Sequence, residues 1–200
     1  FSYLYKIVEK LMCYYCENIT VNKEIIKNKN YNLVNPSSLN NEWFKNISVP
    51  SLDKINLLYV GRIKIEKGVY SILEIFKKIL KEKKGANLTL IGHGDKIDDL
   101  ESSIQIDAPI TDQDALIKKY DENNIVVLPS FTEGHPRVLI EALARKRPVI
   151  IFDEISHVKQ KYNGVFICQR EMKNFLKTAE SIIKNFKDIQ LSMDKNIYPT

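Results

Sequence analysis

Two glutamates in one short segment could bind neighbouring hydroxyl groups. In PSFTEGHPRVLIEALA, Glu133 precedes a predicted helix and Glu141 lies about one and a half turns inside it, four residues after Arg137. Residues at this spacing share a helix face, so both carboxylates can face one cavity. A carboxylate accepts hydrogen bonds from the two hydroxyls of a ribose or hexose diol. The alternative is that both glutamates are exposed on an ordinary helix, although two charges beside an apolar strand end would not by themselves stabilise a fold.

A second segment, YVGRIKIEKG, places two cations where an anion could bind. Arg62 and Lys67 lie five residues apart, directly after the apolar run 55–60. Fixed positive charge and a bidentate guanidinium suit a diphosphate. Gly61 allows close backbone approach and Gly68 permits the turn into the next helix. The pattern predicts an anion clamp, and a charged surface loop remains the alternative.

The start of the helix after Pro136 is a further candidate anion site. Proline suits the first turn of a helix, and the amides around Arg137 and Val138 would then point at an anion. Gly134 leaves the preceding loop room to bend.

Two glycines, Gly92 and Gly94, end another apolar run. A dinucleotide-binding motif requires a third glycine three residues on, where this sequence has Ile97, so an NAD-type site is excluded. Close approach of the backbone to some other ligand stays open. His93, between the glycines, is interpreted as structural or exposed rather than catalytic.

The elements that must position these residues alternate along the chain. Apolar runs predict strands, and runs with helical spacing predict helices between them. Strands are expected at Ile55–Val60, Leu88–Ile91, Ile125–Leu128, Val149–Phe152 and Val165–Ile167, and helices at 68–83, 95–102, 111–120, after Pro136 and at 172–186. Strands that are apolar throughout indicate an α/β fold, a Rossmann-like parallel sheet with helices on both faces. Such sheets bind ligands beyond the carboxyl ends of their strands.

The segment before this pattern is different in character. Spacing predicts a helix over 3–15, short strands at 19–21 and 31–34, and a linker over 45–54. The chain begins at Phe1 within an amphipathic stretch, so we expect the residues before it to be missing.

Charge and cysteine content narrow the class of protein. The net charge of +5 comes from lysines spread over the chain, which favours a solvated surface, with contact to an anionic membrane surface as the alternative. Basic residues do not form a stripe interleaved with aromatics, so no nucleic acid is expected as a partner. Cys13, Cys16 and Cys168 lack the second Cys or His pair of a zinc site, so buried thiols, a reducing cytoplasm and no metal are expected.

Taken in order, these motifs resemble family 4 glycosyltransferases. Glu133 and Glu141 match the E-x7-E signature, YVGRIKIEKG is similar to the G-R-x(4)-K-G loop, and LTLIGHGD is similar to a strand ending in a G-x-G turn. TDQDALIKKYDENNIVVLPS resembles the helix and strand that lead into the signature. The resemblance covers residues 55–152, with weaker similarity before them.

The resemblance implies a GT-B fold, in which two Rossmann domains face each other across a cleft. Residues 1–46 would be the end of the N-terminal, acceptor-side domain, and residues 47–200 the nucleotide-sugar-binding domain. By position, the resemblance implies the following contacts with a donor: Arg62 and Lys67 with the diphosphate, the amides of Gly134, His135, Arg137 and Val138 with the phosphates, Glu133 with the sugar, Glu141 with the ribose, Gly61, Gly92 and Gly94 near the nucleotide, and Pro109 and Ile110 near the base.

The implied reaction is the transfer of a sugar to an acceptor hydroxyl with retention of configuration, with Glu133, Arg62 and Lys67 as its catalytic residues. The donor would be a UDP- or GDP-sugar, without a metal or other cofactor. The acceptor would be a glycan or a lipid-linked glycan, in capsule- or lipopolysaccharide-type assembly, bound by the missing N-terminal domain. The enzyme would act in the cytoplasm, with the inner face of the membrane as an option. The 200 residues alone are expected to be inactive.

Departures from the family pattern leave alternatives open. The stretch 152–158 stands where many members have a Gly-Gly-x-Pro-Glu loop, and His157 could replace a donor contact there. His135 stands where an aromatic residue is common, and could either contact the donor or fill space. A nucleotide-sugar-binding module without activity, or a sugar-nucleotide epimerase on the same fold, are the alternative functions. The E-x7-E signature argues against the epimerase.

Overall fold

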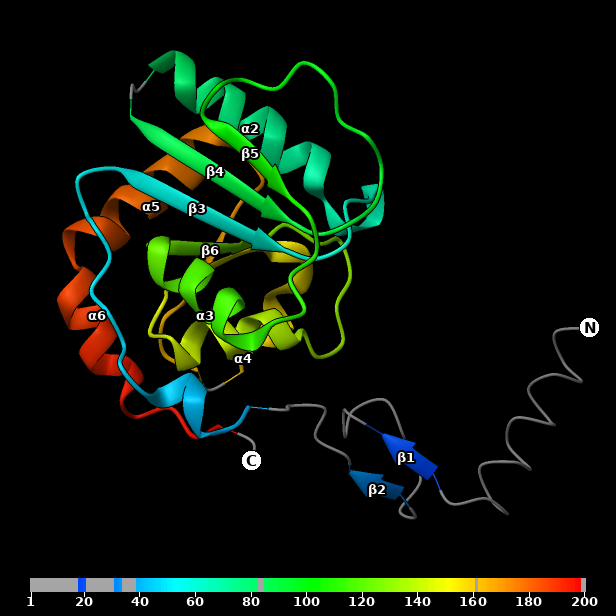
Figure 1. The fold of residues 1–200 in the computed structure, drawn as a ribbon, viewed down its shortest axis with the longest axis vertical. Helices are drawn as coiled ribbons and strands as arrows, with labels where there is room; N and C mark the ends of the chain where they lie inside the picture. The colour runs from blue at the N-terminus through cyan, green and yellow to red at the C-terminus, as the bar shows by residue number, and fades with distance from the viewer. Residues whose placement is uncertain (1–17, 21–30, 34–38, 83–84, 161, 199–200) are drawn as a thin grey trace, which may run out of the picture.

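The computed structural model describes residues 18–20, 31–33, 39–82, 85–160 and 162–198. The helix predicted over 3–15 lies outside these residues. Near the N-terminus, β1 (Asn18–Thr20) pairs in parallel with β2 (Tyr31–Leu33), within one residue of the predicted bounds. All of the residues in the predicted alternating pattern from 55 to 186 belong to one domain around a single sheet, apart from the few that are not described (Figure 1).

The sheet has six parallel strands in the order β5-β4-β3-β6-β7-β8. The strands are β3 (Ile55–Val60), β4 (Ala86–Ile91), β5 (Ile104–Asp107), β6 (Ile125–Leu128), β7 (Val149–Phe152) and β8 (Val165–Cys168). The helices are α2 (Val69–Glu82), α3 (Gln113–Glu122), α4 (Arg137–Ala144), α5 (Met172–Lys184) and α6 (Phe186–Met193), with short 3-10 helices η1 (Asn41–Phe44), η2 (Ile65–Lys67) and η3 (Asp153–Lys159). The expected Rossmann-like α/β fold is confirmed.

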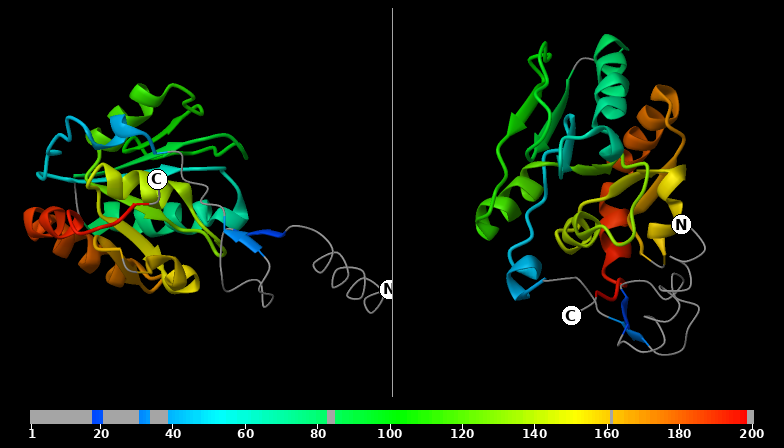
Figure 2. Two further views of the ribbon diagram at one scale, coloured as in Figure 1. Left: turned by 90° about the horizontal axis from the view of Figure 1, so that it is seen from below. Right: turned by 90° about the vertical axis from the view of Figure 1, so that its right-hand side faces the viewer.

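Helices cover both faces of the sheet because its strands are apolar on both sides. The pairs α2 with α5, and α3 with α4, lie on opposite faces (Figures 1 and 2). One core layer joins Phe76 of α2 and Phe175 of α5 to the sheet, and the other joins Tyr120 of α3 and Leu139 of α4 to it. Within the part of the chain that the structure describes, every helix is too short or too polar to cross a bilayer.

Two expectations for the middle of the chain are wrong. The predicted helix at 95–102 is an irregular segment, in which Asp99 has a left-handed backbone with φ of 55° that a helix cannot contain. Strand β5 was not expected, although Ile104 and Ile106 alternate with polar residues as an edge strand requires. Helix α3 begins one cap residue later than the predicted capping box, because the Asp112 carboxylate accepts from the amide of Ala115.

The last predicted helix is divided in two. Helix α5 ends at Lys184 and α6 begins at Phe186, with Asn185 outside helical geometry between them. The side chain of Asn185 donates to the carbonyl of Ser181, in place of the continuing backbone ladder. The break allows Phe186 and Met193 to be buried against the domain.

Strand order decides which loops meet. Strands β4, β3 and β6 are neighbours at the centre of the sheet, so the loops after them leave the same edge side by side. These loops are residues 61–68, 92–95 and 129–136, and they contain the motifs singled out in the sequence.

Candidate functional site

Gly92 and Gly94 are explained by contact between two loops. The amide of Ile63 donates to the carbonyl of His93 at 2.8 Å, and the amide of Gly61 donates to Ile91 at 2.9 Å. A Cβ atom at Gly92 would lie 1.9 Å from the carbonyl oxygen of Gly61, and one at Gly94 would lie 2.0 Å from that of Ile63. Side chains are therefore excluded here by the protein's own backbone, without any appeal to a ligand.

Arg62 lies at the tip of the first loop with its side chain in solvent. The turn is fixed from inside, because the Tyr59 hydroxyl donates to the Arg62 carbonyl at 2.6 Å. Burial raises the pKa of Tyr59 far above its usual value, so this donor stays protonated. The Arg62 side chain is 57% exposed, and its nearest ion pair is a weak 3.8 Å contact with Glu66 in the same loop. Its guanidinium can therefore turn toward a ligand at little energetic cost.

Lys67 and Glu133 form the contact that joins the first loop to the third. Nζ of Lys67 donates to Oε1 of Glu133 at 2.7 Å, and the Ser130 hydroxyl donates to the same oxygen at 2.7 Å. The side chains of Lys67 and Glu133 are only 24% and 14% exposed. Between the same loops, the amide of Phe131 donates to the carbonyl of Glu66 at 3.2 Å. The cation of one predicted motif and the carboxylate of another therefore share one half-buried site.

Arg170, which the sequence analysis did not select, holds the third loop. Its Nη1 donates to the carbonyl of Pro129 at 2.8 Å and to the Ser71 hydroxyl at 2.7 Å. Its guanidinium carbon lies 4.2 Å from the ring centres of both Phe131 and Phe152. Arg170 follows the end of β8 by two residues, so the rule that functional residues follow strand ends would have found it.

The divergent stretch after β7 also contacts the third loop. Glu154 of η3 accepts from Nε of Arg170 at 2.9 Å, and this hydrogen bond lowers the pKa of the Glu154 carboxyl. Nε2 of His157 lies 2.7 Å from the carbonyl oxygen of Glu133. Because a carbonyl only accepts, the ring nitrogen must carry the proton. His157 thus supports the backbone of Glu133 in this structure.

Glu141 is buried on the first turns of α4, between an exposed and a buried partner. Oε1 lies 3.4 Å from Nη2 of Arg137, whose side chain is 57% exposed, and Oε2 accepts from the Tyr120 hydroxyl at 2.9 Å. Pro136 is the N-cap of α4 and offers no side-chain hydrogen bond to the helix. The N-terminus of α4, with Val138 half-buried in its first turn, follows Glu133 by only a few residues.

Three further predicted residues differ in how they are placed. Nε2 of His135 is buried without a hydrogen-bond partner among the described residues, and burial lowers the pKa of its imidazole. Pro109 is exposed, and Ile110 packs partly into the core layer of α3 and α4. Both follow β5, whose last residue, Asp107, accepts from the amide of Gly92 at 3.1 Å. The loop after β5 therefore leaves the sheet beside the glycine turn.

In the described ranges, no group of three or more His, Cys, Asp or Glu side chains is arranged to hold a metal ion. Cys168 is buried at the end of β8, and burial raises the pKa of its thiol to about 12. The thiolate, which is the metal-binding and nucleophilic form, is therefore disfavoured there.

Comparison with known proteins places this arrangement in a family. The profile described as "Glycosyl transferases group 1" matches residues 54–185, which contain the whole six-stranded sheet, the three loops and α4. The chain belongs to the group 1 glycosyltransferases. The resemblance drawn from the motifs is confirmed, and the sheet is the Rossmann-like domain of a GT-B glycosyltransferase.

Relatives of this glycosyltransferase are longer proteins. It is 28% identical over 172 residues to an uncharacterized glycosyltransferase of Haemophilus influenzae, with 80% of this chain and 48% of the relative aligned. It is 29% identical over 146 residues to the capsular polysaccharide biosynthesis glycosyltransferase CapM of Staphylococcus aureus, with 70% and 38% aligned.

A solved structure has the same fold. The structure of S. aureus TarM in complex with fondaparinux, alpha-GlcNAc-glycerol and UDP matches with a TM-score of 0.70 at 17% identity, over 90% of this chain and 39% of that one. The glycosyltransferase chain thus spans less than half the length of each of these three proteins.

Proposed function

We propose that this chain is the donor-binding half of a retaining glycosyltransferase that moves a sugar from a nucleoside diphosphate to an acceptor hydroxyl. The observation that carries the proposal is the pairing of Lys67 with Glu133 at the strand ends, beside the N-terminus of α4. A cation, a carboxylate and helix amides at one edge of a parallel sheet suit a phosphorylated sugar.

The diphosphate is assigned to the positive groups. Lys67 is half-buried and fixed, Arg62 is exposed and free to turn, and α4 presents its positive end without a side-chain cap. The leaving nucleoside diphosphate gains negative charge as the glycosidic bond breaks. Groups that neutralise this charge bind the transition state more tightly than the substrate, which is the condition for faster turnover. The proposed reaction requires no metal, because these groups supply the charge.

The sugars are assigned to the two carboxylates. Glu133 would accept from hydroxyls of the transferred sugar, and Glu141 from those of the ribose. Gly134, between them, supports this assignment: a Cβ there would meet no protein atom, and its φ lies outside the left-handed region. Neither packing nor backbone geometry therefore requires this glycine, whereas close approach of a ligand to the backbone would.

The base and the acceptor are the finer parts of the proposal. Pro109 and Ile110, at the edge beyond β5, would lie near the base, and the UDP in the TarM structure favours a UDP-sugar over a GDP-sugar as donor. The CapM relative, named for capsular polysaccharide biosynthesis, favours a glycan or lipid-linked glycan as acceptor, and hence work in the cytoplasm at the inner face of the membrane. The acceptor would bind to the remainder of the protein, because this chain spans less than half of its relatives.

A ligand screen followed by a transfer assay tests the proposal. In the screen, the melting temperature of this chain is measured with UDP-, GDP- and ADP-sugars, and one of them should raise it. In the assay, the complete protein should transfer sugar from that donor in the presence of EDTA, and NMR of the product should show the anomeric configuration of the donor. Stabilisation without transfer would favour a binding module that lacks activity, and no stabilisation by any donor would remove the proposal.

A further inference from the structure

Glu141 is anchored from inside the domain by a tyrosine. The hydroxyl of Tyr120, a fully buried residue near the end of α3, donates to Oε2 of Glu141 at 2.9 Å. The two residues are 21 positions apart and lie on adjacent helices of the same face of the sheet (Figure 1). Burial, and then the charge of Glu141, raises the pKa of the Tyr120 phenol, so its hydroxyl remains a donor at every physiological pH.

This contact leaves the two carboxylate oxygens in different surroundings. Oε2 is turned inward to Tyr120, while Oε1 lies near Arg137, which reaches into solvent. A carboxylate held at one oxygen cannot rotate freely about its last bond, so the other oxygen keeps a fixed direction. Fixing a polar group before the ligand arrives reduces the entropy lost on binding.

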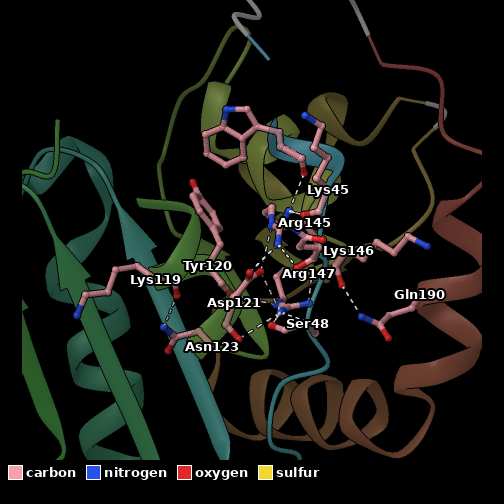
Figure 3. Close-up of polar contacts among 12 residues, drawn as sticks. Lys45, Ser48, Lys119, Tyr120, Asp121, Asn123, Arg145, Lys146, Arg147 and Gln190 are labelled. Carbon is pink, nitrogen blue, oxygen red and sulfur yellow. Dashed lines mark hydrogen bonds and ion pairs between the residues drawn. The ribbon is translucent and has the colours of Figure 1, made fainter. Parts of the chain in front are cut away.

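Tyr120 is itself held from two sides. The ring of Trp43 in η1 packs edge-on against the Tyr120 ring, with centroids 5.6 Å apart and an interplanar angle of 70°. The carbonyl of Tyr120 accepts from Nε of the buried Arg147 at 3.0 Å. Figure 3 shows Arg145 and Arg147 meeting Asp121, the residue after Tyr120. The phenol thus has a defined position rather than a range of positions.

We propose that Tyr120 is a positioning residue, which orients Glu141 so that its outer oxygen meets the hydroxyls of the donor's ribose. The inference rests on the proposed function, because it concerns the ligand of the same site. Tyr120 has no direct contact with the ligand in this scheme. Its effect must therefore depend on the presence both of the Glu141 carboxylate and of ribose hydroxyls.

The test compares Tyr120→Phe with the unaltered protein on two ligands, UDP and its 2′,3′-dideoxy analogue, by isothermal titration calorimetry. The substitution removes only the hydroxyl and keeps the ring against Trp43. We expect affinity for UDP to fall about tenfold, which corresponds to about 1.4 kcal/mol. Affinity for the dideoxy analogue should change less than twofold. A purely structural effect would weaken both ligands equally, and that result, or an unchanged affinity for UDP, would overturn the inference.

Two further variants keep the result interpretable. Tyr198→Phe removes a different tyrosine hydroxyl, which donates to the carbonyl of Leu143 on the same helix α4 at 2.8 Å, and it should leave UDP affinity unchanged. In a Glu141→Gln background, Tyr120→Phe should cause little additional loss, since its effect passes through the carboxylate. A full additional loss there would contradict the inference even if Tyr120→Phe alone proved unstable and only the double variant were compared with its parent. Failure of the unaltered protein to bind UDP, GDP or ADP would instead contradict the proposed function, and the inference would fall with it.

Discussion

Nζ of Lys67 lies 2.7 Å from Oε1 of Glu133, although the two residues are 66 positions apart in the chain. The contact exists because β3 and β6 are neighbours in the sheet, so that the loops after them leave the same edge together. Ser130 donates to the same oxygen, which fixes the carboxylate from a second side. A motif that binds phosphate and a motif that binds sugar hydroxyls are in this way held in one frame.

Removal of the Lys67 charge should impair turnover more than removal of most surface charges. Lys67→Met should lower kcat by about 100-fold, the order of magnitude for losing one charge-stabilising group in a transition state. Arg62→Ala should also weaken donor binding and lower turnover sharply. Steady-state kinetics of the complete protein, with Lys64→Met as a control in the same loop, would measure both effects. Rates near those of the unaltered protein for both variants would remove the diphosphate clamp from the proposed function.

The glycines of the site should divide into two kinds. Gly92→Ala places a Cβ 1.9 Å from the Gly61 carbonyl oxygen, so the free energy of unfolding should fall by about 1–3 kcal/mol or more. Gly134→Ala meets no atom within 4 Å, and should change it by less than about 0.5 kcal/mol. Urea denaturation of both variants would measure the difference. Equal losses would show that the two loops are less tightly joined than the structure indicates.

The pair of Glu154 and Arg170 should make stability depend on pH. The hydrogen bond from Arg170 lowers the pKa of Glu154 below its usual 4.5, so the stabilisation is complete above that pH and is lost as pH falls through the lowered value. The melting temperature of the unaltered protein should therefore exceed that of Glu154→Gln at pH 7, and the difference should shrink below pH 4.5. In an Arg170→Met background the same substitution should show no such pH-dependent difference. A gap that is constant from pH 7 to pH 3 would contradict the assignment.

The segment before β3 should depend on a buried arginine. Arg147 is fully buried and donates to the carbonyls of Ser48, Tyr120 and Arg145. Arg147→Met would leave these oxygens without their donor, so the free energy of unfolding should fall by about 3 kcal/mol. Lys118→Met, at a side chain that is 75% exposed, should change it by less than about 0.5 kcal/mol. A similar stability of the two variants in chemical denaturation would show that Ser48 and its neighbours are held in another way.

The sequence by itself determined the fold class and most of the strand ends. Apolar runs such as Ile125–Leu128 and Val149–Phe152 can be buried on both faces only in a helix-covered parallel sheet, and local spacing is enough to show this. It also identified Glu133, Lys67 and Glu141 as residues of one site, since each follows the end of a strand. It failed at 95–102 and at β5, where the chain is short, polar and near an edge, so that periodicity carries little information.

Only the tertiary structure decided which partners these residues have. Tyr120 reads as one more apolar residue on a helix, and its bond to Glu141 arises because α3 and α4 pack on the same face of the sheet. Arg170 reads as a surface charge, yet it is enclosed by Phe131, Phe152 and the third loop. Gly92 reads as a ligand-binding glycine, whereas the Gly61 carbonyl already fills the space beside it. Local periodicity encodes which residues face inward, but contacts between residues distant in sequence depend on strand order, which a single sequence does not display.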